Sequence, residues 1–453
     1  MKKFLEKYNF SNGVKNVAKI SGGTMAGQLL SFITLPIYTR IYGATVIGNW
    51  ALFTSIATIV NSFSDLGLSN AIMIENSEED SLRVYKVIST IVLITSLITG
   101  FFSYIYYSIK PEETGISTWF IALTLTVLII TSQQSQVCYT LLNRKGAYDI
   151  LMKNPVVNQV LIAVIAIPLG FLGVQKYGYY IGLIAGQLGM IVHMKRFLPR
   201  EMFTFKKKDF EVVLKRHVTF WKYQLPTNLV SNVKNQLPTL MIKALFGSEM
   251  LGYYSVSVRI LNIPINLLAN AIGRVYFHTA SLKIRNGEPI GNYTYQNIVK
   301  AIKVALIPII GMMAFGDLAL TIFLGEGYEI AGQMFRIVVL QNFFMFLMIA
   351  TQGITAILKK QKYAMVSCIL QSIGYAVGLA AGAYIFNSVY IGLILMSVAY
   401  IIIQIVYFCV LFKAMETSWV LYLRSVVVSM AILLVSTFSL RGIMLLLGII
   451  HSI

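Results

Sequence analysis

Two cations stand inside segments that are apolar and long enough to cross a membrane. Lys234 lies twelve residues after Lys222, which is about 18 Å along a helix, and Arg259 reaches a comparable depth on the next segment. An ionised side chain near the middle of a bilayer costs about 3 kcal/mol or more, so both must face protein or water. They could bind an anion in a cavity. The alternative is that backbone carbonyls or an acid satisfy them in a packed bundle.

Each of these two segments, 222–247 and 251–277, carries polar residues every three or four positions, the spacing of one helical face. In the first segment the face comprises Thr227, Ser231, Lys234 and Pro238. In the second it comprises Ser255, Arg259, Asn262, Asn266, Asn270 and Arg274. Lipid does not tolerate such faces, which therefore predict a wet or protein-lined interior.

The predicted cavity needs cations for an anionic group and amides or hydroxyls for neutral polar groups. Its predicted residues are Lys234, Arg259, Arg274, Asn262, Asn266, Asn270, Thr24, Gln28, Gln133 and Gln136. Guanidinium can grip phosphate oxygens through two hydrogen bonds, whereas the Lys ammonium acts as a point charge. For any single Asn or Gln, an interhelical hydrogen bond remains the alternative role.

Asp65 and Asp317 are the acids that lie well inside predicted spans. They could couple transport to an H+ or Na+ gradient or pair with the cavity bases, and pairing is the favoured role. We expect no cofactor and no metal site, because the cysteines and histidines have no metal-like spacing. These residues are Cys138, Cys368, Cys409, His193, His217, His278 and His451.

The composition is that of a polytopic helical membrane protein. The chain has 453 residues, 57% of them hydrophobic and 12% charged, and its net charge is +19. The mean hydropathy of +0.72 lies far above the globular range. The positive charge follows the positive-inside rule rather than indicating nucleic acid. It predicts a cytoplasmic N-terminus, an inside loop at 195–221, and outside turns at Ala44 and Ser248.

The sequence predicts an all-α fold with two six-helix lobes, at 1–194 and 222–413. Between them, 195–221 reads as a basic cytoplasmic linker with an amphipathic helix at about 210–220 lying on the anionic leaflet. One or two additional helices occupy 414–453. The predicted spans are 17–38, 46–73, 87–109, 117–139, 155–173, 179–194, 222–247, 251–277, 298–324, 334–358, 364–386, 389–412 and 420–439, with a short last helix at 442–450.

An internal repeat supports two halves. Gly43 and Gly48 flank the first outer turn, and Gly247 and Gly252 flank the turn between the seventh and eighth spans, 204 residues later in both cases. The same outer position in both halves favours parallel repeats related by an axis along the membrane normal. Chance similarity between amphipathic helices is the rival explanation.

The runs LPIYTRIYG, GNWALF and DLGLSNAI, with QLPTLMIKALFG and LGYYSVSVRILNIPINLLANAIGRVYF in the second half, resemble the Wzx-type polysaccharide-repeat flippases. These form a branch of the multidrug/oligosaccharidyl-lipid/polysaccharide exporter superfamily. The resemblance covers essentially the whole chain, although the C-terminal region is shorter than the fourteen-helix pattern of many relatives. It implies two lobes in a V and alternating access at the bacterial cytoplasmic membrane.

The resemblance also implies the cargo, an undecaprenyl-pyrophosphate-linked oligosaccharide for O-antigen, capsule or another surface polysaccharide. Expected partners are this lipid-linked oligosaccharide, membrane lipids, and polymerase and chain-length proteins of the same pathway. The alternatives are a multidrug or cation antiporter of the same superfamily and a membrane polysaccharide polymerase or ligase. Short outer loops argue against an enzyme, basic cavity residues argue against a cation exporter, and no Walker sequence is present for ATP.

Overall fold

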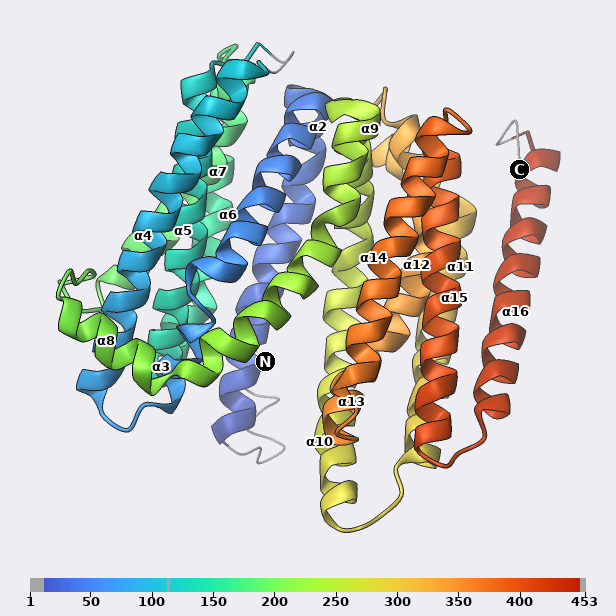
Figure 1. Cartoon of the computed structure of the whole chain (residues 1–453). Helices are drawn as coiled ribbons and strands as arrows, with labels where there is room; N and C mark the ends of the chain where they lie inside the picture. The colour runs from blue at the N-terminus through green and yellow to red at the C-terminus, as the bar shows by residue number, and fades with distance from the viewer. Residues whose placement is uncertain (1–11, 112–114, 449–453) are drawn as a thin grey trace. The chain divides into compact units, whose positions relative to one another are not determined.

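The fold is entirely helical over the part of the chain that the structure describes (Figure 1). The computed structural model describes residues 12–111 and 115–448. The basic N-terminal ten residues and the last residues of the predicted helix at 442–450 lie outside that range. The predicted all-α polytopic class is confirmed, and the chain divides into two compact units, Met1–Gln236 and Leu237–Ile453.

Unit 1 contains four long helices after an initial helical hairpin. Its elements are α2 (Asn12–Ser64), a 3₁₀ turn (Leu68–Asn70), α3 (Ala71–Ile74), α4 (Glu78–Ile109), α5 (Thr118–Arg144), α6 (Tyr148–Phe171), α7 (Gln175–Lys195), α8 (Lys207–Arg216), a π-helical turn (Phe220–Gln224) and the start of α9 (Leu225–Pro264).

Unit 2 begins within α9. The elements that follow are a π-helical turn (Ile265–Ala269), α10 (Asn270–Arg285), α11 (Gly291–Leu324), α12 (Glu329–Ala350), α13 (Ile354–Ile357), α14 (Gln361–Tyr384), α15 (Val389–Ala414) and α16 (Trp419–Leu446).

Neighbouring helices pair in the same order inside each unit. In unit 1, α4 packs on α5, α6 packs on α7, and α5 also contacts α7. In unit 2, α11 packs on α12, α14 packs on α15, and α12 also contacts α15. The same internal order in both units is what two parallel copies of one helical arrangement would give.

The helices α2 and α9 each turn back on themselves at a glycine, as Figure 1 shows. Gly43 has φ 71° and ψ 172°, and Gly247 has φ 90° and ψ 176°. This backbone region is almost closed to residues with a Cβ. The two glycines of the predicted repeat therefore make the same local conformation, one reversal in each hairpin, and the predicted outer turns coincide with both.

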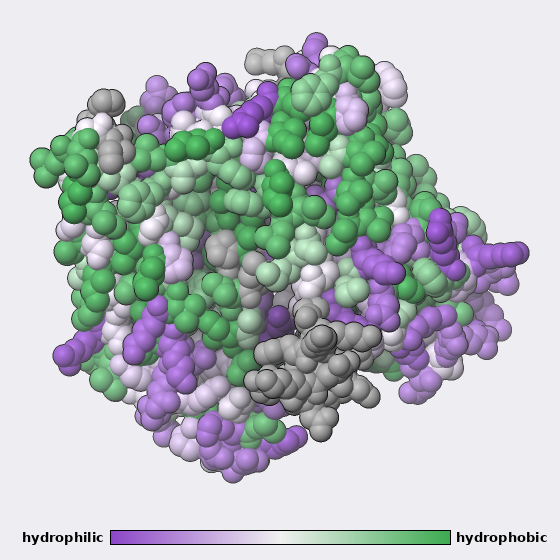
Figure 2. Space-filling model, turned by 180° about the vertical axis from the view of Figure 1, so that it is seen from behind, coloured by the Kyte–Doolittle hydropathy of each residue, from purple (hydrophilic) through white to green (hydrophobic). Residues whose placement is uncertain are grey.

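Nine helices of the described residues are long and apolar enough to cross a membrane. The helices α7, α9 and α10 are not among them, and α9 and α10 carry the predicted polar faces. Seen from behind (Figure 2), hydrophobic side chains cover most of the middle of the surface, and hydrophilic ones gather towards its margins. The polar face of α9 explains why it fails a hydropathy criterion although it has the length to span, whereas α10 has only 16 residues.

The second predicted span ends earlier than expected, at Ser64 instead of residue 73. Leu66 and Gly67 have positive φ values of 51° and 69°, which stop the helix. Asp65 holds this turn, because its Oδ1 accepts a hydrogen bond of 2.9 Å from the Gly67 amide and its Oδ2 one of 2.6 Å from Ser69. The apolar run that follows forms the 3₁₀ turn and α3 instead of continuing the span.

The predicted amphipathic helix of the linker is α8, and its apolar side does not face lipid. Val213 is 2% exposed, and Phe210 and Leu214 pack with it on a core formed by α3, α4, α5 and the ends of α6 and α7. The apolar side of α8 is therefore covered by unit 1, and the placement of the helix on the anionic leaflet stays a prediction.

The predicted short last helix does not exist as a separate element. Residues 442–446 continue α16, whose 28 residues are about 42 Å long. Arg441, which follows the predicted span 420–439, lies within α16 and is 2% exposed. Over the described residues, α16 is the one helix that follows α15.

The glycine reversals predict a specific sensitivity to a methyl group. An ideal Cβ at Gly43 or Gly247 would meet nothing within 4 Å, so Gly43→Ala and Gly247→Ala add backbone strain without a clash. We expect each to lower the free energy of unfolding by about 1–3 kcal/mol, measured by thermal unfolding of the purified protein. Gly311→Ala in α11 also has open space but ordinary helical φ, and it should be neutral or stabilising. Equal behaviour of all three variants would contradict this account.

Candidate functional site

The two predicted cations lie at nearly equal distances from the reversal of α9. Lys234 precedes Gly247 by 13 residues and Arg259 follows it by 12, which is about 18–20 Å of helix in each direction. Both side chains are half-buried, Lys234 in unit 1 and Arg259 in unit 2. With the reversal at one membrane surface, both cations would lie near mid-depth of a hydrocarbon core about 30 Å thick.

The polar face beyond Arg259 passes through the π-helical turn. Arg274 lies 19 positions after Ser255, and in a regular helix its side chain would point about 100° away from the direction of Ser255. The π-helical turn has more residues per turn and reduces this drift. It begins directly after Pro264, which has no amide hydrogen to donate. Together these features keep the predicted polar residues closer to one face than a regular helix would.

The side chains on this face differ in exposure. Asn262 and Asn270 are half-buried, and Arg274 is exposed. The side chain of Asn266 lies outside the described part of the structure. The arrangement therefore offers amides near Arg259 and a second guanidinium nearer the end of the helix.

The predicted site residues of the first half lie on α2 and α5, which contact each other. Thr24 is exposed, and its hydroxyl donates a 3.0 Å hydrogen bond to the Ile20 carbonyl of its own helix. Gln28 is half-buried, Gln133 is 7% exposed, and Gln136 is exposed. Of the two α5 residues, Gln136 is the one whose side chain has open access.

A polar network on α5, which the sequence analysis missed, joins three neighbouring helices. The hydrogen bonds are Thr131 Oγ1 to Gln187 Oε1 of α7 at 2.6 Å, Asn61 Nδ2 of α2 to Ser132 Oγ at 2.7 Å, and Gln134 Nε2 to Ser89 Oγ of α4 at 3.0 Å. Thr131, Ser132 and Gln134 are close in sequence but form hydrogen bonds with three different helices. Such bonds hold membrane helices together. The run of hydroxyls and amides at 131–136 was the signal, but the sequence does not say which side chain meets which neighbour.

Asp317 is held by two arginines. Arg441 Nη1 lies 2.8 Å from Asp317 Oδ2, and Arg336 Nη1 lies 3.3 Å from the same oxygen. Arg441 Nη1 also donates to the Ala314 carbonyl at 3.1 Å. The acid therefore joins α11, α12 and α16. Its partners in these ion pairs are Arg336 and Arg441, not the predicted cavity bases.

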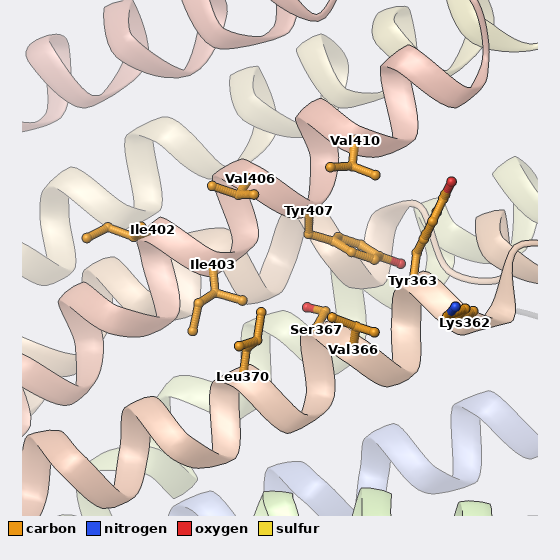
Figure 3. Close-up of a pocket in the computed structure, with 10 residues that line it drawn as sticks. All are labelled: Lys362, Tyr363, Val366, Ser367, Leu370, Ile402, Ile403, Val406, Tyr407 and Val410. Atoms are coloured by element: carbon orange, nitrogen blue, oxygen red, sulfur yellow. The ribbon is translucent and has the colours of Figure 1, made fainter.

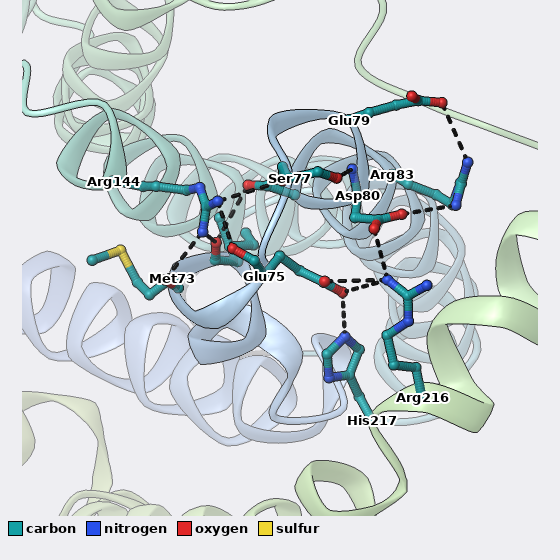
Figure 4. Close-up of polar contacts among 11 residues, drawn as sticks. Met73, Glu75, Ser77, Glu79, Asp80, Arg83, Arg144, Arg216 and His217 are labelled. Atoms are coloured by element: carbon teal, nitrogen blue, oxygen red, sulfur yellow. Dashed lines mark hydrogen bonds and ion pairs between the residues drawn. The ribbon is translucent and has the colours of Figure 1, made fainter.

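Glu75 anchors the linker helix α8 to the segment between α3 and α4 (Figure 4). His217 Nε2 donates to Glu75 Oε1 at 2.7 Å, and both side chains are buried, at 7% and 6% exposed. Arg216 Nη1 lies 3.2 Å from Glu75 Oε2 and 2.9 Å from Asp80 Oδ2. Hydrogen bonding to Asp80 and the charge of Glu75 raise the pKa of the Arg216 guanidinium.

Further contacts extend this anchor on both sides. Arg144 of α5 donates to the carbonyls of Ile72 at 2.9 Å and Glu75 at 2.6 Å, the free carbonyls at the end of α3. In the linker, the hydrogen bond and positive charge of Lys86 lower the pKa of Glu201. The linker is thus bound to unit 1 along its length and is not a loose connection.

Within the described residues, no group of three or more His, Cys, Asp or Glu side chains is arranged to hold a metal ion. His217, which the sequence placed at the interface, is buried against Glu75.

The comparisons with known proteins agree on the kind of protein. A family model described as polysaccharide biosynthesis protein matches residues 37–331. The succinoglycan biosynthesis transport protein ExoT of Rhizobium meliloti is 23% identical over 257 residues, 55% of this chain and 50% of that protein. The chain thus spans about half the length of this curated relative.

Two solved structures share the fold. The lipid II flippase MurJ, in an inward closed conformation, aligns with a TM-score of 0.62 and 14% identity over 96% of this chain and 98% of that one. An inward-facing multidrug resistance MATE family transporter of the MOP superfamily aligns with a TM-score of 0.59 and 15% identity over 88% and 96% of the two chains. At these identities the likeness concerns the fold alone.

The anchor at Glu75 predicts different effects for two neighbouring acids. Glu75→Gln removes a buried charge from Arg216 and His217, so we expect it to cost about 1.5–3 kcal/mol and to speed tryptic cleavage at Arg196 and Arg200. Glu79 is 87% exposed and lies 3.5 Å from Arg83. Glu79→Gln should therefore change stability by less than about 1 kcal/mol and leave cleavage unchanged. Similar cleavage rates for both variants would show that the linker does not depend on Glu75.

Proposed function

Because the chain belongs to the family of polysaccharide biosynthesis proteins, we propose that it translocates lipid-linked oligosaccharides across the bacterial cytoplasmic membrane. The cargo would be a repeat unit on undecaprenyl pyrophosphate, destined for O-antigen, capsule or another surface polysaccharide. The similarity to a succinoglycan biosynthesis transport protein and the fold shared with a lipid II flippase support this proposal. The protein would be a transporter without catalytic residues.

The observation that carries the proposal is the pair of half-buried cations on α9. A pyrophosphate does not cross hydrocarbon unaided, because its charges would lose their hydration. Lys234 and Arg259 would replace that hydration at mid-depth, and Arg259 could hold two phosphate oxygens at once. An anionic group of the cargo would add to the interactions that these two cations already make.

The neutral polar residues would form hydrogen bonds with the sugars of the cargo. Asn262 and Asn270 follow Arg259 on the same helix line, and Gln28 and Gln136 lie on α2 and α5 of unit 1. Amides both donate and accept hydrogen bonds, which suits sugar hydroxyls. Asn266, Gln133, Thr24 and Arg274 complete the proposed set. The faces would be exposed alternately to the two sides of the membrane.

We further propose that an H+ or Na+ gradient drives the cycle. Asp65 and Asp317 are the candidate coupling acids. Asp317 neutralises two arginines in unit 2, and Asp65 holds the turn after α2 through Gly67 and Ser69. Ion pairing inside the fold is the alternative role of these acids.

The proposed orientation places the N-terminus and the linker 195–221 in the cytoplasm and the reversals of α2 and α9 outside. Ser248, next to the α9 reversal, gives the test. A single cysteine there, in a background without native cysteines, should react with a membrane-impermeant maleimide in intact cells. A cysteine at Lys208 in the linker should react only after permeabilisation. If Ser248→Cys were labelled only from the cytoplasmic side, the true topology would be the inverse of the proposed one.

The binding role of the cations predicts a loss of transport without a loss of protein. Arg259→Ala and Lys234→Ala should abolish export of the surface polysaccharide while protein level and membrane insertion stay normal. Lys234→Arg keeps the charge and should retain export. Lys300→Ala, an exposed cation on α11, is the matched control and should export normally.

Export would be measured as surface polysaccharide in a strain that lacks the native gene, with membrane-inserted protein quantified in parallel. If both alanine variants export normally, or fail only because the protein no longer accumulates, the two cations are structural and the assignment is wrong.

A further inference from the structure

A pocket of about 400 Å³ lies between α14 and α15, apart from every residue of the proposed transport site (Figure 3). Its walls are mostly aliphatic, with Val366, Ser367 and Leu370 on α14 and Ile402, Ile403, Val406, Tyr407 and Val410 on α15. Figure 3 shows Lys362 and Tyr363 at one end of the row and Ile402 at the other. The pocket is therefore an apolar channel with a cation at one end.

The pocket begins where the close packing of the two helices stops. A Cβ at Gly378 would come within 2.6 Å of the Met396 backbone, and one at Gly382 within 2.3 Å of Gly392. At Gly374 the approach is already to a side chain, Ala399 at 2.9 Å. From Leu370 back towards the start of α14, bulky residues occupy the positions that face α15. The two helices therefore cannot stay in backbone contact, and a space opens between them.

The pocket continues along both helices as an exposed apolar surface. Val366 and Leu370 are followed on the same face of α14 by Ile373 and Val377, which are 53% and 61% exposed. On α15, Ile402 and Val406 are preceded by Val398, which is 46% exposed. Both helices are long and apolar enough to span a membrane, so this surface is suited to contact with lipid acyl chains.

The charge at the end of the pocket selects among lipids. Lys359 and Lys360 directly precede α14, and Lys362 is in its first turn, so three exposed cations stand where the channel ends. Basic pockets between membrane helices bind the head groups of anionic lipids. The span from Lys362 to Leu370 is about 12 Å, which accommodates part of one acyl chain.

We propose that this pocket binds an anionic glycerophospholipid, with its phosphate at Lys362 and one acyl chain between α14 and α15. The bound lipid fills the space that the glycine contacts leave open and supports the packing of the two helices. This site is independent of the proposed transport of lipid-linked oligosaccharides.

The test uses the full-length protein in detergent, offered equal amounts of phosphatidylglycerol and phosphatidylcholine, with retained lipid counted by native mass spectrometry. Wild-type protein should retain phosphatidylglycerol in preference. Lys362→Gln should reduce that preference about fivefold, which is the attraction of one basic residue for anionic lipid. Lys303→Gln, another exposed lysine of unit 2, should leave it unchanged.

A second pair of variants tests the chain position. Val406→Trp fills the pocket and should reduce retention of both lipids, whereas Ile369→Trp adds the same bulk to an exposed α14 residue outside the lining and should not. If Val406→Trp fails to fold, the Lys362→Gln comparison still decides, because that side chain is exposed. Equal retention of both phospholipids by wild-type protein, or no effect of Lys362→Gln, overturns the proposal. Preferred retention of an added polyprenyl phosphate over phosphatidylglycerol also overturns it.

Discussion

A polar side chain inside a membrane-spanning helix has to be solvated by something other than lipid, and this constraint governs the whole chain. The free-energy cost of exposing an ionised group to hydrocarbon is several times the free energy that an ordinary hydrogen bond contributes to stability. Polar residues therefore decide which helix faces turn to protein, while apolar residues are free to face either lipid or protein. Lys234, Arg259 and Asp317 carry the highest costs of this kind.

The protein meets the constraint in two different ways. Asp317 is compensated by charge, since Arg336 and Arg441 both approach it and three helices are joined as a result. Gln134 and its neighbours on α5 are instead satisfied by hydrogen bonds with one hydroxyl and two amides of adjacent helices. Lys234 and Arg259 are half-buried on α9, which is not among the helices apolar enough to pass as a membrane span.

The two glycine reversals connect this chemistry to the repeat. Gly43 and Gly247 adopt the same backbone conformation, and each reverses the chain between two helical arms without a loop. In α9, Lys234 and Arg259 each lie about 18–20 Å along an arm from the reversal. At the other end, Glu75, Arg216 and His217 fix the linker to unit 1, so that α9 starts from an anchored segment.

The sequence by itself determined the membrane class, the helix order and the position of the reversals, because hydropathy and glycine conformation act over short stretches of chain. The predicted spans agree with the helices to within several residues, except where Asp65 and Gly67 end the second span and where α16 runs on through Arg441. Only the tertiary structure decided the partners: Glu75 with His217, Asp317 with Arg441, and the turning of Val213 onto protein instead of lipid. The residues of the Asp317–Arg441 pair are 124 positions apart and those of the Glu75–His217 pair are 142 positions apart, so both pairs form through the packing of whole helices. No local sequence pattern shows which of several polar side chains will meet.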